Sequence, residues 1–309
     1  MTRLLSNFLF GALTAMLFAL SGLQMRAQRV LPRDYFGGIS THTGHAVGSV
    51  DSVEASMSRL WAAGVRRMRI ELRGGEAIER ADSLLCLTDG CGMEVFMAVP
   101  DTLLLLPAIN AYLEKVERGS HRVVAYTVVH TGCLGAEQVR AGFARLCAAT
   151  PGAFHGFSMA DAGDLLFEEM ARSGRVDFMA LDLRYERQRW SSLDRVREAI
   201  GQVFSRLPLV VDGAVRALEL WEKPLLIDCL DYPRDRAFRG EGTAVTLRDN
   251  VVSCARGVMG RYQGGVRGLF VGSWMGDAYC MARPDADVLY ASDTTTIRLL
   301  TAKSYAHVQ

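Results

Sequence analysis

The chain has 309 residues, half of them hydrophobic, so it can bury a sizeable core. Its formal net charge is +1, which gives no electrostatic reason to expect binding to nucleic acid or to an anionic membrane surface. We therefore expect a globular domain and no nucleic-acid partner.

The first residues have the pattern of a secretory signal. Arg3 supplies a positive start, residues 8–20 form an apolar run, and Ala27 offers a cleavage site. A bilayer-spanning helix needs about 20 apolar residues, so this run predicts no membrane span. We expect a signal peptide at residues 1–27, one mature domain at residues 28–309, and a periplasmic or extracellular location.

From residue 35 onward, short β-type runs alternate with stretches whose apolar residues recur at helical spacing. The predicted strands cover residues 35–40, 65–72, 93–99, 122–129, 154–159, 176–183, 224–230 and 267–274. The predicted helices cover residues 51–64, 77–90, 103–117, 136–150, 163–174, 193–221, 246–263 and 294–308.

Eight such units without a linker predict the α/β class and a single (β/α)₈ TIM barrel. A doubly wound sheet is the alternative. It is disfavoured because no GxGxxG or GxxxxGK[ST] turn follows an early strand, and we expect no cofactor.

The seven cysteines all follow the predicted signal peptide. An odd number in an exported protein leaves at least one thiol unpaired, and Cys86 and Cys91 are close enough to form a small loop. No CxxC pair or histidine cluster suggests a zinc site, so we expect no metal.

In such a barrel the chemistry lies at the carboxyl ends of the strands. The polar and aromatic candidates there are Arg69, Glu71, Thr127, His130, Thr131, Asp182, Arg184, Tyr185, Asp228, Cys229, Asp231, Trp274 and Asp277. Retaining glycoside hydrolysis needs two carboxyl groups about 5 Å apart. The end of the fourth predicted strand offers no carboxylate, which disfavours that chemistry.

Several blocks resemble one family of sugar-cleaving barrels. They are KPLLIDCLDYPRD (223–235), TAVTLRDN (243–250), SHRVVAYTVVHTG (120–132), VDFMALDLRYERQRW (176–190), VGSWMGD (271–277) and YASDTTTIRLLTAKSYA (290–306). In order and spacing the chain is similar to glycoside hydrolase family 5, above all to its β-1,4-mannanases. The resemblance covers most of residues 35–306.

The resemblance implies that both catalytic glutamates are replaced. The acid/base position falls at Thr131, with His130 in place of the preceding asparagine, and the nucleophile position falls at Cys229. The sixth-strand histidine becomes Asp182. A threonine hydroxyl is too weak an acid to protonate a leaving group.

The resemblance also implies that two supporting residues are retained. Arg69 corresponds to the arginine beside the nucleophile, and Trp274 to the platform on which a sugar ring stacks. In the sixth loop, Tyr185 offers a second stacking face. The candidate ligand-binding residues are thus Arg69, His130, Asp182, Tyr185 and Trp274.

Neighbouring residues offer two ways to recover activity. Asp228 or Asp231 would act as a displaced nucleophile, although strand alternation from Cys229 predicts that Asp228 faces away from the barrel interior. Alternatively, Cys229 and His130 would form a thiolate–imidazole pair. We regard Cys229 as a small buried apolar residue in the first instance.

The leading hypothesis is therefore a secreted pseudoenzyme that binds a polysaccharide or oligosaccharide, or acts in an envelope or secreted assembly with a protein partner. The alternative is an active endo-β-1,4-mannanase-type hydrolase with rearranged catalytic residues.

Overall fold

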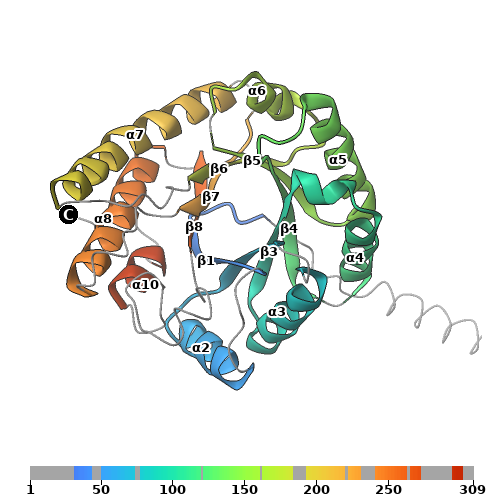
Figure 1. Cartoon of the computed structure of the whole chain (residues 1–309), viewed down its shortest axis with the longest axis horizontal. Coiled ribbons are helices and arrows are strands. Elements are labelled where there is room, and N and C mark those ends of the chain that lie inside the picture. Colours follow the sequence, from blue (N-terminus) through green and yellow to red (C-terminus); the bar gives the residue numbers. More distant parts are fainter. Residues whose placement is uncertain are drawn as a thin grey trace, which may run out of the picture. The chain divides into compact units, whose positions relative to one another are not determined.

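The computed structural model describes residues 31–43, 50–73, 77–119, 121–160, 162–183, 193–219, 222–230, 241–262, 265–272 and 294–301. The predicted signal peptide, Tyr185, Asp231 and Trp274 lie outside these ranges. The compact unit Leu31–Gln309 contains a closed barrel of parallel strands in the order of the chain, with helices around it (Figure 1). The predicted (β/α)₈ barrel is confirmed.

The strands follow the predicted apolar runs closely. They are β1 (Phe36–His42), β2 (Arg67–Glu71), β3 (Glu94–Pro100), β4 (Val123–Val129), β5 (Phe154–Met159), β6 (Phe178–Leu183), β7 (Leu225–Leu230) and β8 (Val266–Gly272). Each pairs in parallel with the next, and β8 closes on β1. All carboxyl ends therefore open at one mouth of the barrel.

The helices are α2 (Val50–Ala62), α3 (Ala77–Cys91), α4 (Pro107–Arg118), α5 (Ala136–Ala149), α6 (Leu165–Arg172), α7 (Leu193–Glu219), α8 (Glu241–Gly260) and α10 (Thr294–Thr301). A short 3₁₀ helix, η1 (Asp101–Leu105), lies between β3 and α4, where the sequence predicted only the start of a helix. Pro107 favours the start of α4 because its missing N–H would have no partner there. The Asp164 carboxylate begins α6 by accepting a hydrogen bond from the Leu166 N–H at 2.8 Å.

Strand residues alternate between two cores. In β2, Met68 and Ile70 join the core between strands and helices, together with Met57 and Leu60 of α2. The lower part of the barrel interior is a separate apolar cluster that includes the rings of Phe36, Phe96 and Phe270. The ring centroid of Phe96 lies 5.4 Å from that of Phe36 and 5.0 Å from that of Phe270.

One glycine makes room for this interior core. A Cβ atom on Gly156 of β5 would lie 2.1 Å from Cε2 of Phe178 on the neighbouring β6. The absence of a side chain at position 156 therefore allows the Phe178 ring to lie across β5.

The upper part of the interior, toward the mouth, is polar instead. Alternation along the strands directs a buried set of side chains inward at this level. They are Ser40, Arg69, Thr127, Ser158, Asp182 and Asp228. This polar layer is the floor beneath the mouth of the barrel.

Candidate functional site

The structure places the predicted site residues that it describes at the mouth of the barrel. Arg69 lies in β2, Asp182 in β6 and Cys229 in β7, and His130 and Thr131 directly follow β4. Parallel strands put all five at the same end. Two other predicted ligand-binding residues, Tyr185 and Trp274, lie outside the described residues.

Arg69 is the centre of a buried ion-pair cluster. Its Nη1 donates hydrogen bonds to Glu71 Oε2 at 2.8 Å and to Ser40 Oγ at 3.2 Å. Its Nε lies 2.9 Å from Asp228 Oδ2. The other oxygen of Glu71 accepts a hydrogen bond from Arg73 Nε. The guanidinium of Arg69 thus joins strands β1, β2 and β7.

Burial and charge act in opposite directions on the groups of this cluster. Burial alone would lower the pKa of Arg69, but the carboxylates of Asp228 and Glu71 raise it well above its usual value. Burial alone would raise the pKa of Glu71, but Arg69 and Arg73 lower it below its usual value. Glu71 and Arg69 are therefore an ionised pair.

The two aspartates respond differently. Burial raises the pKa of Asp228, although Arg69 opposes the shift. Burial raises the pKa of Asp182 to about 8; Arg69 opposes this shift, whereas Glu71 and Asp228 add to it. Asp182 is therefore mostly protonated at neutral pH.

The expectation that Asp228 faces away from the interior is wrong. Leu226 belongs to the interior cluster and Ile227 to the outer core, so Asp228 points inward again. The pairing of β7 with β8 then shifts register between Ile227 and Leu230, which pairs with Val271. This irregularity in β7 breaks the alternation on which the expectation rested.

Cys229 lies in that irregular segment. Its Cα is in register with that of Asp182, and its Sγ lies 3.5 Å from the position that a Cβ on Gly272 would take. The side chain is buried, with 7% exposed. The six cysteines in the described ranges, Cys86 and Cys91 among them, form no disulfide with one another.

A second polar cluster, which the sequence did not predict, centres on Asp101 at the start of η1. The Asp101 carboxylate accepts hydrogen bonds from Thr131 Oγ1 at 2.7 Å and from the Thr102 N–H at 2.8 Å. Its other oxygen lies 2.7 Å from His130 Nδ1. The available signal was a single aspartate two residues after the third predicted strand.

The geometry gives no support to a pair between Cys229 and His130. His130 follows β4 and binds Asp101 through Nδ1, and its ring stacks near Phe157 with centroids 6.3 Å apart. Phe157 belongs to the outer core, so His130 lies over the barrel wall. Strands β5 and β6 separate β4 from the β7 strand that carries Cys229.

The described carboxyl groups at the mouth are engaged in these clusters. The exposed fractions are 1% for Asp101, 2% for Glu71, 0% for Asp228 and 8% for Asp182. Of these four side chains, Asp182 is the most exposed. In the ranges that the structure covers, no group of three or more His, Cys, Asp or Glu side chains is placed to hold a metal ion.

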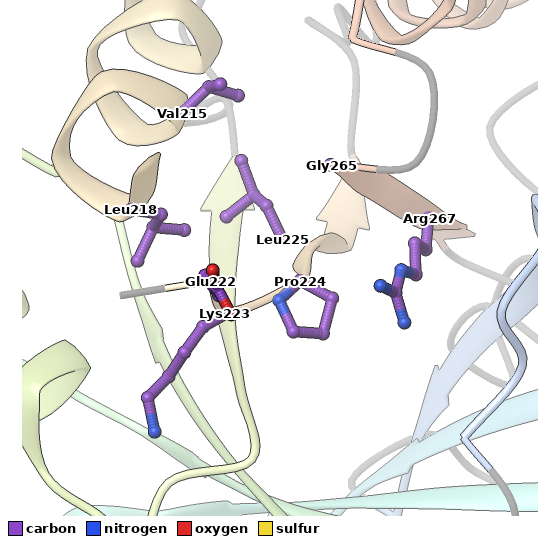
Figure 2. A pocket seen from close by; sticks show the side chains of 8 residues that line it. All are labelled: Val215, Leu218, Glu222, Lys223, Pro224, Leu225, Gly265 and Arg267. Atoms are coloured by element: carbon purple, nitrogen blue, oxygen red, sulfur yellow. The ribbon is translucent and has the colours of Figure 1, made fainter. Parts of the chain in front are cut away.

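A cavity of about 200 Å³ lies at the opposite end of the barrel. Figure 2 shows its lining at the starts of β7 and β8, with Pro224 between Lys223 and Arg267 in this view. Lys223 Nζ donates a hydrogen bond to the Ser173 carbonyl at 2.8 Å and also contacts the Val176 carbonyl. These contacts fix the turn into β7, far from the strand ends where barrels carry chemistry.

Several solved structures that match this fold are glycoside hydrolases. A glycoside hydrolase family 5 mannosidase from Rhizomucor miehei, in complex with mannosyl-fructose, matches with a TM-score of 0.60 and 11% identity over 86% of this chain and 91% of its own. The endo-1,4-beta-mannanase of the same organism matches with a TM-score of 0.59 and 10% identity, covering 90% and 96%. A GH10 endoxylanase from a sugarcane soil metagenome has a TM-score of 0.52 and 9% identity, covering 86% and 97%.

The chain has a glycoside-hydrolase-like barrel fold. At these identities the likeness shows the fold alone. No protein-family model matches the sequence, and neither does any curated protein. Among the described helices, none is long and apolar enough to cross a membrane.

Proposed function

We propose that the chain is an exported, glycoside-hydrolase-like barrel that binds a polysaccharide or oligosaccharide at its mouth without cleaving it. The observation that carries this proposal is the state of the carboxyl groups. Glu71 and Asp228 are buried against Arg69, and Asp101 is buried beneath His130 and Thr131. Among the residues that the structure describes, the mouth does not offer a substrate two carboxyl groups that are free to react.

The positions that the resemblance assigns to catalysis fit the same conclusion. The Thr131 hydroxyl donates a hydrogen bond to Asp101, and Cys229 is buried beside Asp182. Retaining hydrolysis needs one carboxyl to protonate the leaving oxygen and a second to attack the anomeric carbon. Neither Thr131 nor Cys229 supplies a carboxyl group.

Binding itself has support from the polar floor of the mouth. Arg69 Nη2 and Thr127 Oγ1 are buried there without a hydrogen-bond partner among the described residues. Sugar hydroxyl groups are both donors and acceptors, so they would satisfy these two atoms once ligand binding exposed them. We further propose that Tyr185 and Trp274 stack on the apolar faces of sugar rings.

The test is a glycan-array screen of residues 28–309, followed by titration calorimetry with each oligosaccharide that binds. We expect saturable binding that Trp274→Ala weakens by up to about tenfold, since an aromatic contact contributes up to about 1.5 kcal/mol beyond the area that it buries. Trp61→Ala, which changes a helical residue of α2, is the matched control and leaves affinity unchanged. Absence of binding to any glycan would reject the proposal.

One observation favours the alternative of an endo-β-1,4-mannanase-type hydrolase with rearranged residues. A protonated carboxyl group at the mouth is what a general acid requires, and burial keeps Asp182 in that form at neutral pH. Reducing ends released from mannan by the wild-type protein, and not by Asp182→Asn, would support this alternative. If neither protein releases reducing ends, the result supports binding without cleavage.

A further inference from the structure

A surface groove of about 260 Å³ lies between α5 and α6, in the helical layer of the barrel. These two helices flank β5 in the order of the chain and are neighbours in the ring of helices (Figure 1). The side chains that line the groove are Arg140, Phe143, Ala144, Glu169, Met170, Ser173 and Arg175. These residues are not among those of the polar clusters at the mouth.

The floor of the groove is apolar. Phe143 and Met170 are each 3% exposed, and Ala144 is half-buried. The Phe143 ring packs edge-on against the rings of His155 and Phe157, with centroids 6.4 Å apart in both pairs, so its position is well defined. Because an apolar cavity of about 150 Å³ can hold a benzene molecule, this groove has room for an aromatic ring with a short side chain.

The two arginines that line the groove differ in their partners. Arg140 Nη1 donates a hydrogen bond to Glu169 Oε1 at 2.6 Å, so these two charges satisfy each other across the helices. The Arg175 guanidinium makes no hydrogen bond or ion pair with any residue that the structure describes. Burial raises the pKa of the Cys147 thiol to about 11 and Arg175 opposes this shift, which places the Arg175 guanidinium near α5.

The groups around Arg175 leave it available to an anion. The Ser173 hydroxyl oxygen accepts a hydrogen bond from the Arg175 N–H at 3.3 Å and keeps its own proton to donate. The Ser173 carbonyl, at the end of α6, already accepts a hydrogen bond from Lys223 Nζ at 2.8 Å. Asp177 accepts a hydrogen bond from the His155 N–H at 2.7 Å and forms no ion pair with Arg175. A guanidinium without a carboxylate partner and a serine hydroxyl therefore lie beside an apolar floor.

We propose that this groove is a second ligand site, which binds a small carboxylic acid with an apolar body. The body packs on Phe143, Ala144 and Met170, because burial of apolar surface favours association. The carboxylate pairs with Arg175 and accepts a hydrogen bond from the Ser173 hydroxyl. The inference goes beyond the proposed glycan-binding function and does not depend on it.

The test follows the methyl group of Met170 by carbon-13 NMR in methionine-labelled protein, with Met170→Leu to assign the signal. The probes are 3-phenylpropionate and its neutral amide, 3-phenylpropanamide, which share the same apolar body. We expect the acid to shift the Met170 signal saturably with a dissociation constant of about 1 mM, the affinity typical of a ligand of this size. The amide should bind about fivefold more weakly, the most that an exposed ion pair usually contributes.

Three variants locate the site. Arg175→Gln should weaken binding of the acid about fivefold and leave binding of the amide unchanged, so that the two probes bind this variant equally. Ala144→Phe fills the groove and should abolish the shift for both probes. Arg145→Gln removes an exposed arginine of α5 that does not line the groove, and this matched control should bind both probes as the wild type does.

The comparison of the two probes on the wild-type protein decides the proposal even where a variant fails to fold. If the acid gives no saturable shift up to about 20 mM, the groove is not a ligand site. If the acid and the amide bind with equal affinity, or if Arg175→Gln keeps the preference for the acid, the assigned carboxylate contact is wrong. Each of these results would overturn the proposal and leave glycan binding at the mouth unaffected.

Discussion

Replacing Arg69 with methionine tests the buried cluster most severely. Methionine has a similar length but no charge, so Glu71 and Asp228 would lose the guanidinium that both contact. At 2.9 Å and an effective dielectric constant of 20, each contact is worth roughly 6 kcal/mol before desolvation is subtracted. Breaking a buried pair on one side typically costs about 3–5 kcal/mol. We expect Arg69→Met to lower the free energy of unfolding by that amount at pH 8.

The loss should depend on pH in a defined direction. In the wild-type protein, Arg69 and Arg73 keep the pKa of Glu71 below its value in the unfolded chain. Glu71 therefore stabilises the fold at a pH above its unfolded pKa, and this contribution is lost as the pH falls through the folded pKa. Without Arg69, the folded pKa of Glu71 rises, and ionisation becomes unfavourable. The difference between wild type and variant therefore grows between pH 5 and pH 8, by as much as about 1.4 kcal/mol per pH unit for each carboxyl group.

Urea unfolding followed by circular dichroism at pH 5 and pH 8 measures this difference. Arg59→Met, which removes an exposed arginine of α2, is the control and should change stability by no more than about 0.5 kcal/mol. In the double variant Arg69→Met with Asp228→Asn, the loss should be smaller than the sum of the two single losses. A loss below about 1 kcal/mol for Arg69→Met, or an equal loss at both pH values, would refute the reasoning.

Three further predictions concern single sites. Gly156→Ala places a methyl group against Phe178 and should lower the free energy of unfolding by at least about 2 kcal/mol. The control Gly174→Ala has no heavy atom within 4 Å of its new Cβ and should leave stability nearly unchanged, and paired thermal unfolding curves compare the two variants. Asp101→Asn disturbs the hydrogen bonds to His130 and Thr131 and should lower the free energy of unfolding by about 1–3 kcal/mol. Urea titrations measure this loss, and an unchanged midpoint would show that the Asp101 cluster does not stabilise the fold. Because the pKa of Asp182 rises from 3.8 to about 8 on folding, the free energy of unfolding of the wild-type protein should decline as pH rises from about 4 to 8. In Asp182→Asn this decline should be smaller by up to about 5 kcal/mol, and parallel pH profiles for the two proteins would contradict the prediction.

The barrel was predictable because its signal repeats. Each strand is an apolar run such as VVAYTVV (123–129), which is buried along its whole length, and an amphipathic helix follows. Parallel order then places every strand end at one mouth, so the positions of Arg69, Asp182 and Cys229 followed from the sequence alone. The 3₁₀ helix η1 was missed because its leucines resemble the start of α4.

The contacts within the mouth were less predictable, for two physical reasons. Alternation predicts the side on which a residue lies only in a regular strand, and the register shift in β7 reversed the expectation for Asp228. Long-range polar pairs leave no local pattern either. Asp101 binds residues almost thirty positions later in the chain, and nothing near Asp101 in the sequence indicates that His130 and Thr131 will be its partners.

The central proposal is that the mouth binds glycan and does not cleave it. The most direct measurement incubates purified residues 28–309 with a glycan already shown to bind, at saturating concentration, and quantifies new reducing ends over time. We predict no release above a heat-inactivated blank at any pH from 5 to 9. Among the described carboxyl groups, Glu71 and Asp228 are engaged with Arg69, and Asp101 is engaged with His130 and Thr131, so Asp182 has no second free carboxyl group to act with it. Sustained release that Asp182→Asn abolishes, with binding intact, would contradict this proposal and establish a rearranged hydrolase.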